Sequence, residues 1–300
     1  MAVTLEADTK STAYKSQLIA EFIAAQHERV SRSRGGRPLM VSMQGPQGAG
    51  KSTLAAALVD LLSTHFGLRT AVASLDDFYL TRAGLDALAE GSSTNAMLSG
   101  RGPPGTHDAD LLASTLAEVS ARSTSEPVTP LRLPIFDKSL FDGRGDRSTS
   151  VVTVDGPIDV FILEGWSMGF RAVSTADAQL RWSQGRVAHT HPFDSVRELN
   201  DNLSSFDART REFFHCHVAI EPRSYEYVYR WRLQQEHHMK RLNGGKGMSD
   251  EAVREFVDRY MPSYEVFGGQ EPTLPTLKLV YGEDREVEEV VRDDQPGEKA

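Results

Sequence analysis

Residues 45–52 are the feature that most constrains the fold of this chain. They read Gly-Pro-Gln-Gly-Ala-Gly-Lys-Ser and match the pattern G-x-x-x-x-G-K-[ST]. An apolar run, Leu39 to Met43, precedes the pattern, and apolar residues at helical spacing, from Leu54 to Leu62, follow it. The order of strand, glycine-rich loop and helix distinguishes a phosphate-binding loop from a glycine-rich turn that binds nothing. The sequence therefore predicts a phosphate-binding loop (P-loop).

The same loop predicts how a nucleotide is held. Backbone N–H groups of the glycines converge on phosphate oxygens, and the helix N-terminus adds a partial positive charge. Lys51 is expected to reach the β- and γ-phosphates, and the Ser52 hydroxyl to bind Mg²⁺. The residues expected to bind the nucleotide are Gly45, Pro46, Gln47, Gly48, Ala49, Gly50, Lys51, Ser52 and Thr53.

The alternation of segments along the rest of the chain predicts the fold class. Apolar runs typical of strands alternate with segments of helical period, which indicates a mostly parallel sheet with helices on both faces. We therefore expect an α/β chain with the three-layer fold of P-loop NTPases. Further strands are expected at 69–75, 159–164, 213–220 and 276–281, with a proline-broken edge strand at best over 128–136.

One large domain is expected to hold most of the chain. The expected division is an N-terminal helix and linker over 1–37, a P-loop domain with lid and substrate loops over 38–281, and an acidic, fraying tail over 282–300. Residues 174–194 show no clear period, and we expect an inserted loop there. A long basic helix is expected over 223–242, ended by residues 243–245, and Ser249 is expected to cap the next helix.

Composition excludes several classes of protein. The net charge of −9 argues against non-specific binding of nucleic acid, which needs a basic face. No apolar run approaches the roughly twenty residues of a membrane span, and the N-terminus lacks the apolar core of a secretory signal. Cys216 is the single cysteine, which suits a reducing compartment, so we expect a cytoplasmic protein. The histidines lack the spacing of a zinc site.

Acidic residues at two strand ends are candidates for metal binding and catalysis. Glu164 ends an apolar strand and is the best second metal ligand beside Ser52, although an acid there could instead cap a helix. Asp76 and Asp77 follow another strand, and side-chain alternation sends them to opposite faces. Asp76 is preferred as the base that orients an acceptor hydroxyl, with Tyr79 beside it on the substrate side.

Basic residues are candidates for binding the phosphate and the acceptor. In the basic helix, Arg230 and Arg232 are two residues apart and lie on different faces, so only one can point at phosphate; spacing does not decide which. Each is also compatible with a solvated face. Four further side chains lie in glycine-containing loops and suit an anionic small-molecule substrate: His107, Lys138, Arg144 and Arg147.

Several segments together resemble the D-glycerate 3-kinase family, which includes plant enzymes and fungal ATP-dependent kinase homologues. More distantly the chain is similar to uridine kinases, phosphoribulokinases and pantothenate kinases. The resemblance covers roughly residues 38–281 and rests, besides the P-loop, on Ser-Leu-Asp-Asp-Phe-Tyr-Leu-Thr (74–81), Gly-Arg-Gly-Pro-Pro-Gly-Thr-His-Asp (100–108), Phe-Asp-Lys-Ser (136–139), Gly-Arg-Gly-Asp-Arg (143–147), Leu-Glu-Gly-Trp (163–166) and Val-Tyr-Arg-Trp-Arg-Leu-Gln (228–234).

The resemblance implies a P-loop kinase that uses ATP and Mg²⁺. It implies that Asp76 is the base, that Glu164 is the metal acid and that Arg232, rather than Arg230, is the lid arginine acting with Lys51. Two segments depart from the family pattern: residues 102–105 are richer in proline, and 174–194 are longer. Both lie near the acceptor side of the expected site, so they bear on the substrate rather than on the phosphoryl chemistry.

We therefore expect a kinase that moves the γ-phosphate of ATP to a hydroxyl, with D-glycerate the favoured acceptor. Another small alcohol, a nucleoside or a pantothenate-like molecule, is the alternative acceptor. A GTPase switch is disfavoured because the chain has no Asn-Lys-x-Asp motif. A non-catalytic ATP-binding protein is disfavoured because Lys51, Ser52, Asp76 and Glu164 are all present.

Overall fold

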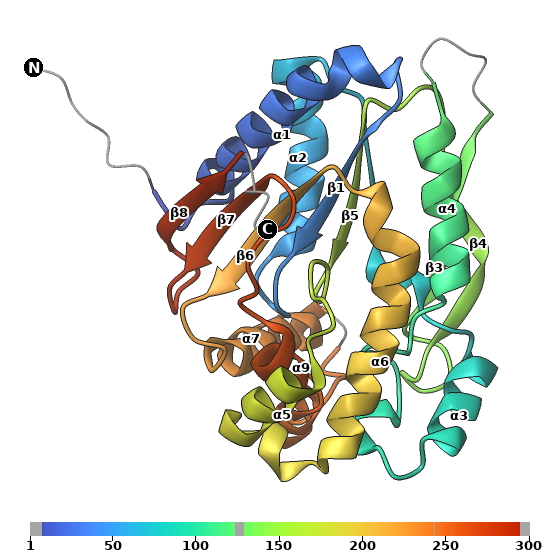
Figure 1. Ribbon diagram of the computed structural model, residues 1–300, viewed down its shortest axis with the longest axis vertical. Coiled ribbons are helices and arrows are strands. Elements are labelled where there is room, and N and C mark those ends of the chain that lie inside the picture. The colour runs from blue at the N-terminus through green and yellow to red at the C-terminus, as the bar shows by residue number, and fades with distance from the viewer. Residues whose placement is uncertain (1–7, 124–128, 243, 295–300) are drawn as a thin grey trace, which may run out of the picture.

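A six-stranded sheet forms the centre of the protein (Figure 1). The computed structural model describes residues 8–123, 129–242 and 244–294. The strand order is β2-β5-β1-β6-β7-β8, in which the first five strands are parallel and β8 is antiparallel to β7. The strands are β1 (Leu39–Gln44), β2 (Thr70–Ser74), β5 (Val160–Gly165), β6 (Cys216–Pro222), β7 (Thr276–Tyr281) and β8 (Val287–Asp293).

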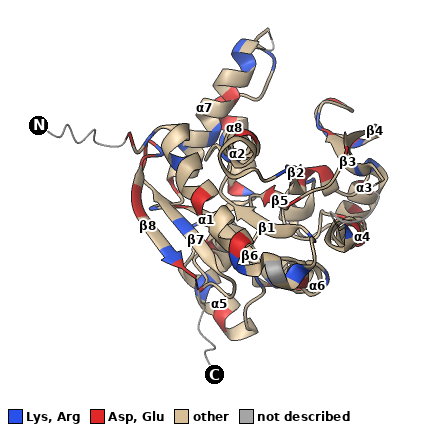
Figure 2. Ribbon diagram, turned by 90° about the horizontal axis from the view of Figure 1, so that it is seen from above, with Lys and Arg blue, Asp and Glu red and all other residues tan. Residues whose placement is uncertain are grey.

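Helices cover both faces of this sheet. Figure 2 shows α1 (Thr12–Arg34) and α2 (Lys51–Phe66) on one side, and α4 (Ala109–Ala121) and α6 (Phe193–Thr210) on the other. The predicted α/β fold, a mostly parallel sheet between two layers of helices, is confirmed. The remaining helices are α3 (Arg82–Gly91), α5 (Thr175–Gln184), α7 (Tyr227–Leu242), α8 (Asp250–Asp258) and α9 (Met261–Phe267), with short 3₁₀ turns at 75–78, 96–98, 188–190 and 211–213.

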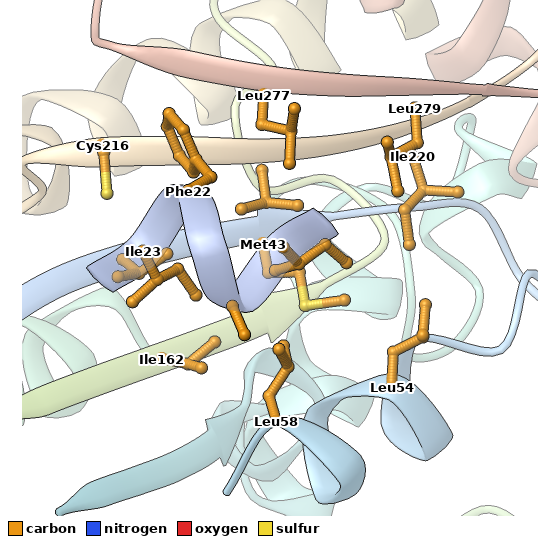
Figure 3. Packing of buried hydrophobic residues seen from close by; sticks show 14 of the residues in the cluster. Phe22, Ile23, Met43, Leu54, Leu58, Ile162, Cys216, Ile220, Leu277 and Leu279 are labelled. Carbon is orange, nitrogen blue, oxygen red and sulfur yellow. The ribbon is translucent and has the colours of Figure 1, made fainter. Parts of the chain in front are cut away.

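The core between the sheet and the helices α1 and α2 fixes the position of the P-loop. Met43 near the end of β1 packs with Phe22 and Ile23 of α1 and with Leu54 and Leu58 of α2 (Figure 3). All six residues of β1 are buried, as are all six of β5. Burial on both faces is why these strands read as unbroken apolar runs.

Side chains cap two helix starts, and the cap at Ser249 was predicted. The Ser249 side chain accepts a hydrogen bond from the backbone N–H of Ala252, and Asp108 does the same for Leu111 at the start of α4. Helix α7 begins at Tyr227, four residues later than predicted. Its last residue is Leu242. Residue 243, which was predicted to help end the helix, lies outside the described residues.

The prediction of an inserted loop over 174–194 is wrong. Ser174 caps helix α5, and this helix packs against α6 and α9. Ala178 is the single residue of α5 that is buried. A helix that buries one small side chain carries no apolar stripe, so its period could not be seen in the sequence.

The expectation that the C-terminal tail frays is wrong for the residues that form the edge of the sheet. Residues 287–293 form β8 and pair with β7 instead of fraying, whereas 295–300 lie outside the described residues. Only Val287 of this strand is buried, so its sequence reads as an exposed acidic segment. The turn between β7 and β8 reaches the P-loop, because Arg285 Nε donates a hydrogen bond to the Gly48 carbonyl at 2.7 Å.

A separate hairpin forms the wall beside the cleft described below. It consists of β3 (Leu131–Asp137) and β4 (Asp146–Val154). The register shifts between Pro134 and Phe136, an irregularity of the kind at which a strand tolerates proline. The predicted proline-broken edge strand is therefore confirmed over 131–136; residues 124–128 lie outside the described part.

Candidate active site

The P-loop connects β1 to α2 in the geometry that phosphate binding requires. Gly48 (φ +73°) and Gly50 (φ +90°) have left-handed backbone conformations that side chains disfavour. Gly48 also lies against helix α7, since a Cβ added there would be 2.6 Å from the backbone carbonyl carbon of Trp231. Gly48 is thus required both by its conformation and by its contact with α7.

Lysine, serine and glutamate side chains meet directly beyond this loop. Ser52 Oγ donates a hydrogen bond to Glu164 Oε1 at 3.0 Å, and Glu164 is only 5% exposed. The parallel register places Glu164 opposite Met43, at the end of β1 that leads into the P-loop. Lys51 Nζ donates to the Pro46 carbonyl at 3.2 Å. Burial lowers the pKa of Lys51, against the opposing effect of the nearby Glu164 carboxylate.

Asp76 points into the same space from the end of β2. It lies in a 3₁₀ turn rather than in the strand. The Tyr79 hydroxyl donates to Asp76 Oδ1 at 2.9 Å, and the Lys138 ammonium forms an ion pair with Oδ2. Burial alone would raise the pKa of Asp76, but the Lys138 charge and these hydrogen bonds outweigh it, so its pKa is lowered.

The two neighbouring aspartates diverge, as the sequence predicted. Asp77 Oδ1 accepts a hydrogen bond from the Phe136 backbone N–H at 3.1 Å, so Asp77 faces β3 while Asp76 faces the cleft. The predicted cause was wrong: the 3₁₀ turn, not strand alternation, separates the two carboxylates.

One large cleft collects most of the predicted site. Its volume is about 1240 Å³, and it lies between the P-loop, the ends of β2 and β5, the β3–β4 hairpin and helices α7 and α8. The predicted residues that line it are Gln47, Gly48, Lys51, Ser52, Asp76, Tyr79, Lys138, Arg144, Glu164 and Arg232. Residues separated by more than 180 positions therefore share one space.

The two arginines of α7 have different surroundings. Arg232 lines the cleft, is 9% exposed, and lies 2.8 Å from Glu236 Oε2 with its guanidinium over the Phe256 ring. Arg230 points away and pairs with Glu283 and Asp284 on the surface. The geometry therefore places Arg232, and not Arg230, in the lining of the cleft.

Comparison with known proteins places the chain in a family. A D-glycerate 3-kinase from Cryptococcus neoformans var. grubii matches with a TM-score of 0.87 and 39% identity, covering 93% of this chain and 99% of that one. The probable ATP-dependent kinase TDA10 of Saccharomyces cerevisiae is 37% identical over 77% of this chain and 78% of its own length. The chain belongs to the D-glycerate 3-kinase family. No family model matches the chain.

Membership of the D-glycerate 3-kinase family confirms the resemblance inferred from the motifs and the predicted kinase class. The chloroplastic D-glycerate 3-kinase of Arabidopsis thaliana is also 37% identical, over 80% of this chain. The chain spans about half the length of that plant relative, since the match covers 48% of it. No helix in the described ranges has the length and apolar character needed to cross a membrane.

Two predicted substrate-binding residues of this family member do not line the cleft. His107 is buried and stacks on Tyr79 with ring centroids 4.5 Å apart, and burial lowers its pKa to about 4. Arg147 donates to the Tyr79 carbonyl and to Asp108 Oδ2, at 2.8 and 3.0 Å. Both side chains contact the segment that carries Tyr79 instead of lining the cleft.

Several cations that were not predicted from the sequence also line the cleft. Arg101 lies between Gly100 and Gly102, and it donates to two carbonyls of the β3–β4 hairpin. Arg259 of the α8–α9 junction donates to the carbonyls of Gly100 and Arg101. The Gly-Arg-Gly segment was itself a family motif, and an arginine between two glycines was the signal that could have found Arg101. Arg82 and Lys246 also line the cleft.

Proposed function

We propose that the chain is an ATP-dependent kinase that transfers the γ-phosphate of ATP to a hydroxyl group of D-glycerate, with Mg²⁺ as the metal. The observation that carries this proposal is the cleft itself: the P-loop lysine, the Asp76 carboxylate and a group of basic side chains share one space. The names of the relatives support ATP as the donor and D-glycerate as the acceptor.

The residues around Ser52 and Glu164 fit a magnesium ion. Both offer oxygen atoms, the ligand type that Mg²⁺ prefers. In the described ranges no group of three or more His, Cys, Asp or Glu side chains is placed to hold a metal. We therefore propose that Ser52 and Glu164 supply the protein's share and that phosphate oxygens and water supply the rest. The ion would neutralise charge on the transferring phosphate.

Asp76 is proposed to orient the acceptor. The acceptor's hydroxyl oxygen forms the new bond to the γ-phosphorus, the bond from that phosphorus to the β–γ bridging oxygen breaks, and ADP leaves. The hydroxyl proton passes to Asp76, which in a loose transition state mainly holds the hydroxyl in line. Tyr79, which donates to Asp76, keeps the carboxylate aimed at the cleft.

The acceptor's carboxylate is proposed to bind the cations opposite the P-loop. Lys138 and Arg144 of the hairpin line the cleft together with Arg101, which the hairpin carbonyls hold in place. Arginine and lysine side chains bind a carboxylate with charge-assisted hydrogen bonds. A neutral nucleoside offers these cations no negative charge, which favours a small acid over the nucleoside alternative.

Helix α7 is proposed to bring Arg232 to the γ-phosphate. We expect Arg232→Ala to lower kcat by about a hundredfold or more, because the arginine stabilises charge that grows in the transition state. Arg230→Ala, two residues away in the same helix but facing Glu283, is the matched control and is expected to keep nearly full activity. Equal losses in the two variants would remove Arg232 from this role. Steady-state kinetics measure both.

Lys138 is proposed to determine the pH below which activity is lost. Since its charge lowers the pKa of Asp76 against the effect of burial, removing it leaves burial dominant. We expect Lys138→Met to move the acid limb of the kcat/KM profile to higher pH, because a raised pKa leaves Asp76 protonated over a wider range. Lys246→Met, which removes another lysine of the cleft lining, is the control. An unmoved limb in Lys138→Met would contradict the assignment.

A coupled assay of ADP release tests the proposed acceptor. We expect turnover with D-glycerate to exceed the ATP-only background and the turnover with L-glycerate, uridine or pantothenate. Turnover with uridine or pantothenate and not with D-glycerate would transfer the proposal to the alternative acceptor class.

We propose that the protein works in the cytoplasm on a small anionic substrate, without nucleic acid. Burial raises the pKa of its single thiol, Cys216, to about 12, so this cysteine stays an unreactive core group suited to a reducing compartment. The net charge of −9 supports the absence of a nucleic-acid partner.

A further inference from the structure

Arg285 lies in the turn between β7 and β8 and does not line the nucleotide cleft, yet it contacts the P-loop. Its Nε donates a hydrogen bond to the Gly48 carbonyl at 2.7 Å, and its Nη1 donates to Gln234 Oε1 at 2.8 Å. Its Nη2 donates to the Trp231 carbonyl at 3.4 Å, and the guanidinium lies 5.2 Å from the centre of the Trp231 ring. The guanidinium therefore connects the P-loop to helix α7, which also carries Arg232.

The backbone of Arg285 has a conformation that favours glycine, with a φ of +63°. The Arg285 N–H donates to the Gly282 carbonyl at 3.0 Å, and the Gly282 N–H donates to the Glu286 carbonyl at 2.9 Å. These bonds are typical of a three-residue hairpin loop whose last residue is left-handed, a position that glycine usually occupies. The Cβ of an arginine is disfavoured there, so the presence of arginine indicates that its side chain has a role.

The turn that carries Arg285 is attached to α7 by further contacts. Trp231 Nε1 donates a hydrogen bond to the Glu283 carbonyl at 2.7 Å. Arg230 forms ion pairs with Glu283 and Asp284 on the surface. Exposed ion pairs contribute little stability, whereas the hydrogen bond of the buried indole is shielded from water. The position of Arg285 is therefore expected to survive the loss of Arg230.

The acceptors of the Arg285 guanidinium are neutral oxygen atoms. In the described ranges no carboxylate lies within ion-pair distance of it. Asp284 acts on its charge from farther away and is itself paired with Lys10 and Arg230. A hydrogen bond from a charged donor is stronger than one between two neutral groups. The bond from Arg285 to the Gly48 carbonyl is thus a strong restraint on the P-loop.

The peptide group between Gly48 and Ala49 is held at both ends. Its carbonyl accepts from Arg285, and its N–H donates to the Pro46 carbonyl at 3.2 Å. The same Pro46 carbonyl accepts from Lys51 Nζ at 3.2 Å. Phosphate binding needs backbone N–H groups that are fixed in convergent directions, and the left-handed Gly48 leaves this peptide group few other restraints. A loop without the Arg285 bond has to be ordered by the nucleotide itself, which lowers affinity.

We propose that Arg285 is a positioning residue that holds the P-loop in its nucleotide-binding conformation before ATP arrives. It acts through the Gly48 carbonyl and not on the reacting atoms, so its loss weakens the binding of ATP and leaves the transfer step of the bound complex intact. The role of Arg285 rests on the proposed function only in that ATP is the nucleotide; it does not depend on the acceptor.

Calorimetric titration of ATP with Mg²⁺ compares the unaltered chain with Arg285→Gly. Glycine suits the left-handed turn, so the urea midpoint of unfolding is expected to stay close to that of the unaltered chain. We expect the dissociation constant of ATP to rise about tenfold or more, the effect of losing a charged hydrogen bond, with kcat at saturating ATP nearly unchanged. Arg230→Ala is the matched control, because it loosens the same turn from the same helix, and it is expected to bind ATP normally.

Hydrogen exchange of the Ala49 amide, followed by nuclear magnetic resonance without nucleotide, tests the restraint itself. This amide belongs to the peptide group whose carbonyl Arg285 holds. We expect its exchange to quicken about tenfold in Arg285→Gly, because the loop opens more often, and to stay unchanged in Arg230→Ala. Unchanged exchange in Arg285→Gly would overturn the proposal.

Three further results would overturn it: an unchanged ATP affinity in Arg285→Gly, an equal loss in Arg230→Ala, or a loss of kcat alone. Arg285→Lys decides the matter where Arg285→Gly folds poorly, since it keeps the charge and the backbone conformation but loses the fork. Its ATP affinity is expected to fall as well, and an affinity equal to that of the unaltered chain would show that charge alone matters. An unaltered chain that binds ATP without phosphorylating D-glycerate would contradict the proposed acceptor and leave this test in place.

Discussion

Replacing Asp76 by asparagine is expected to lower the rate of phosphoryl transfer by about 10²–10⁴-fold, because the amide cannot take the proton of the acceptor hydroxyl. ATP binding is expected to survive, since the P-loop contacts with phosphate do not involve this carboxylate. The fold is also expected to survive, because the partner of Asp76, the Lys138 side chain, is 51% exposed and becomes solvated when the pair is lost. Single-turnover kinetics and a nucleotide titration measure the two effects separately.

The neighbouring Asp77→Asn is the matched control for this experiment. Asp77 accepts a backbone hydrogen bond from Phe136, and an asparagine oxygen can accept the same bond. We therefore expect nearly unchanged turnover. Comparable losses in both variants would mean that activity depends on the negative charge of this segment and not on a contact between Asp76 and the acceptor. Full activity in Asp76→Asn would remove Asp76 from the mechanism.

Replacing Gly48 by alanine is expected to disable the phosphate cradle. Its left-handed backbone alone disfavours alanine by roughly 1–2 kcal/mol. The added Cβ would also lie 2.6 Å from the Trp231 carbonyl carbon, so the loop or helix α7 must move. We expect ATP affinity to fall by about a hundredfold or more, since backbone N–H groups that no longer converge lose several phosphate hydrogen bonds.

Gly67→Ala separates the effect of the left-handed backbone from the effect of the contact between Gly48 and Trp231. Gly67 ends the same helix α2 with a similar φ of +65°, but a Cβ there meets nothing within 4 Å. It is expected to lower the free energy of unfolding by about 1 kcal/mol and to leave ATP binding unchanged. Urea unfolding and calorimetric titration of ATP compare the two variants. Loss of ATP binding in both, or in neither, would contradict the account of Gly48.

The parts of this fold that the sequence predicted correctly are those with strong local signals. The buried strands β1 and β5 are unbroken apolar runs, and the P-loop lies between β1 and an apolar helix. The ends of these parallel strands meet at one edge of the sheet, so Ser52 and Glu164 were predictable as neighbours from the topology alone.

The parts that the sequence did not predict depend on tertiary contacts. Helix α5 buries a single alanine, and strand β8 buries a single valine, so neither shows a period. His107 was expected in the cleft because it lies in a glycine-rich loop. Instead, its backbone forms an isolated antiparallel β-bridge with Tyr79, and its side chain is buried. The choice of Arg232 over Arg230 came from family resemblance. Helical spacing shows that the two side chains lie on different faces of the helix, but it does not show which face points toward the cleft.

The identity of the phosphorylated product tests the central claim most directly. The purified chain is incubated with Mg²⁺, D-glycerate and ATP that carries an isotopic label in its γ-phosphate, and the products are identified by mass spectrometry. We expect labelled phosphoglycerate, formed in equal amount with ADP. Folded protein that binds ATP but leaves glycerate unlabelled, with the label in ATP or in free phosphate, would contradict it.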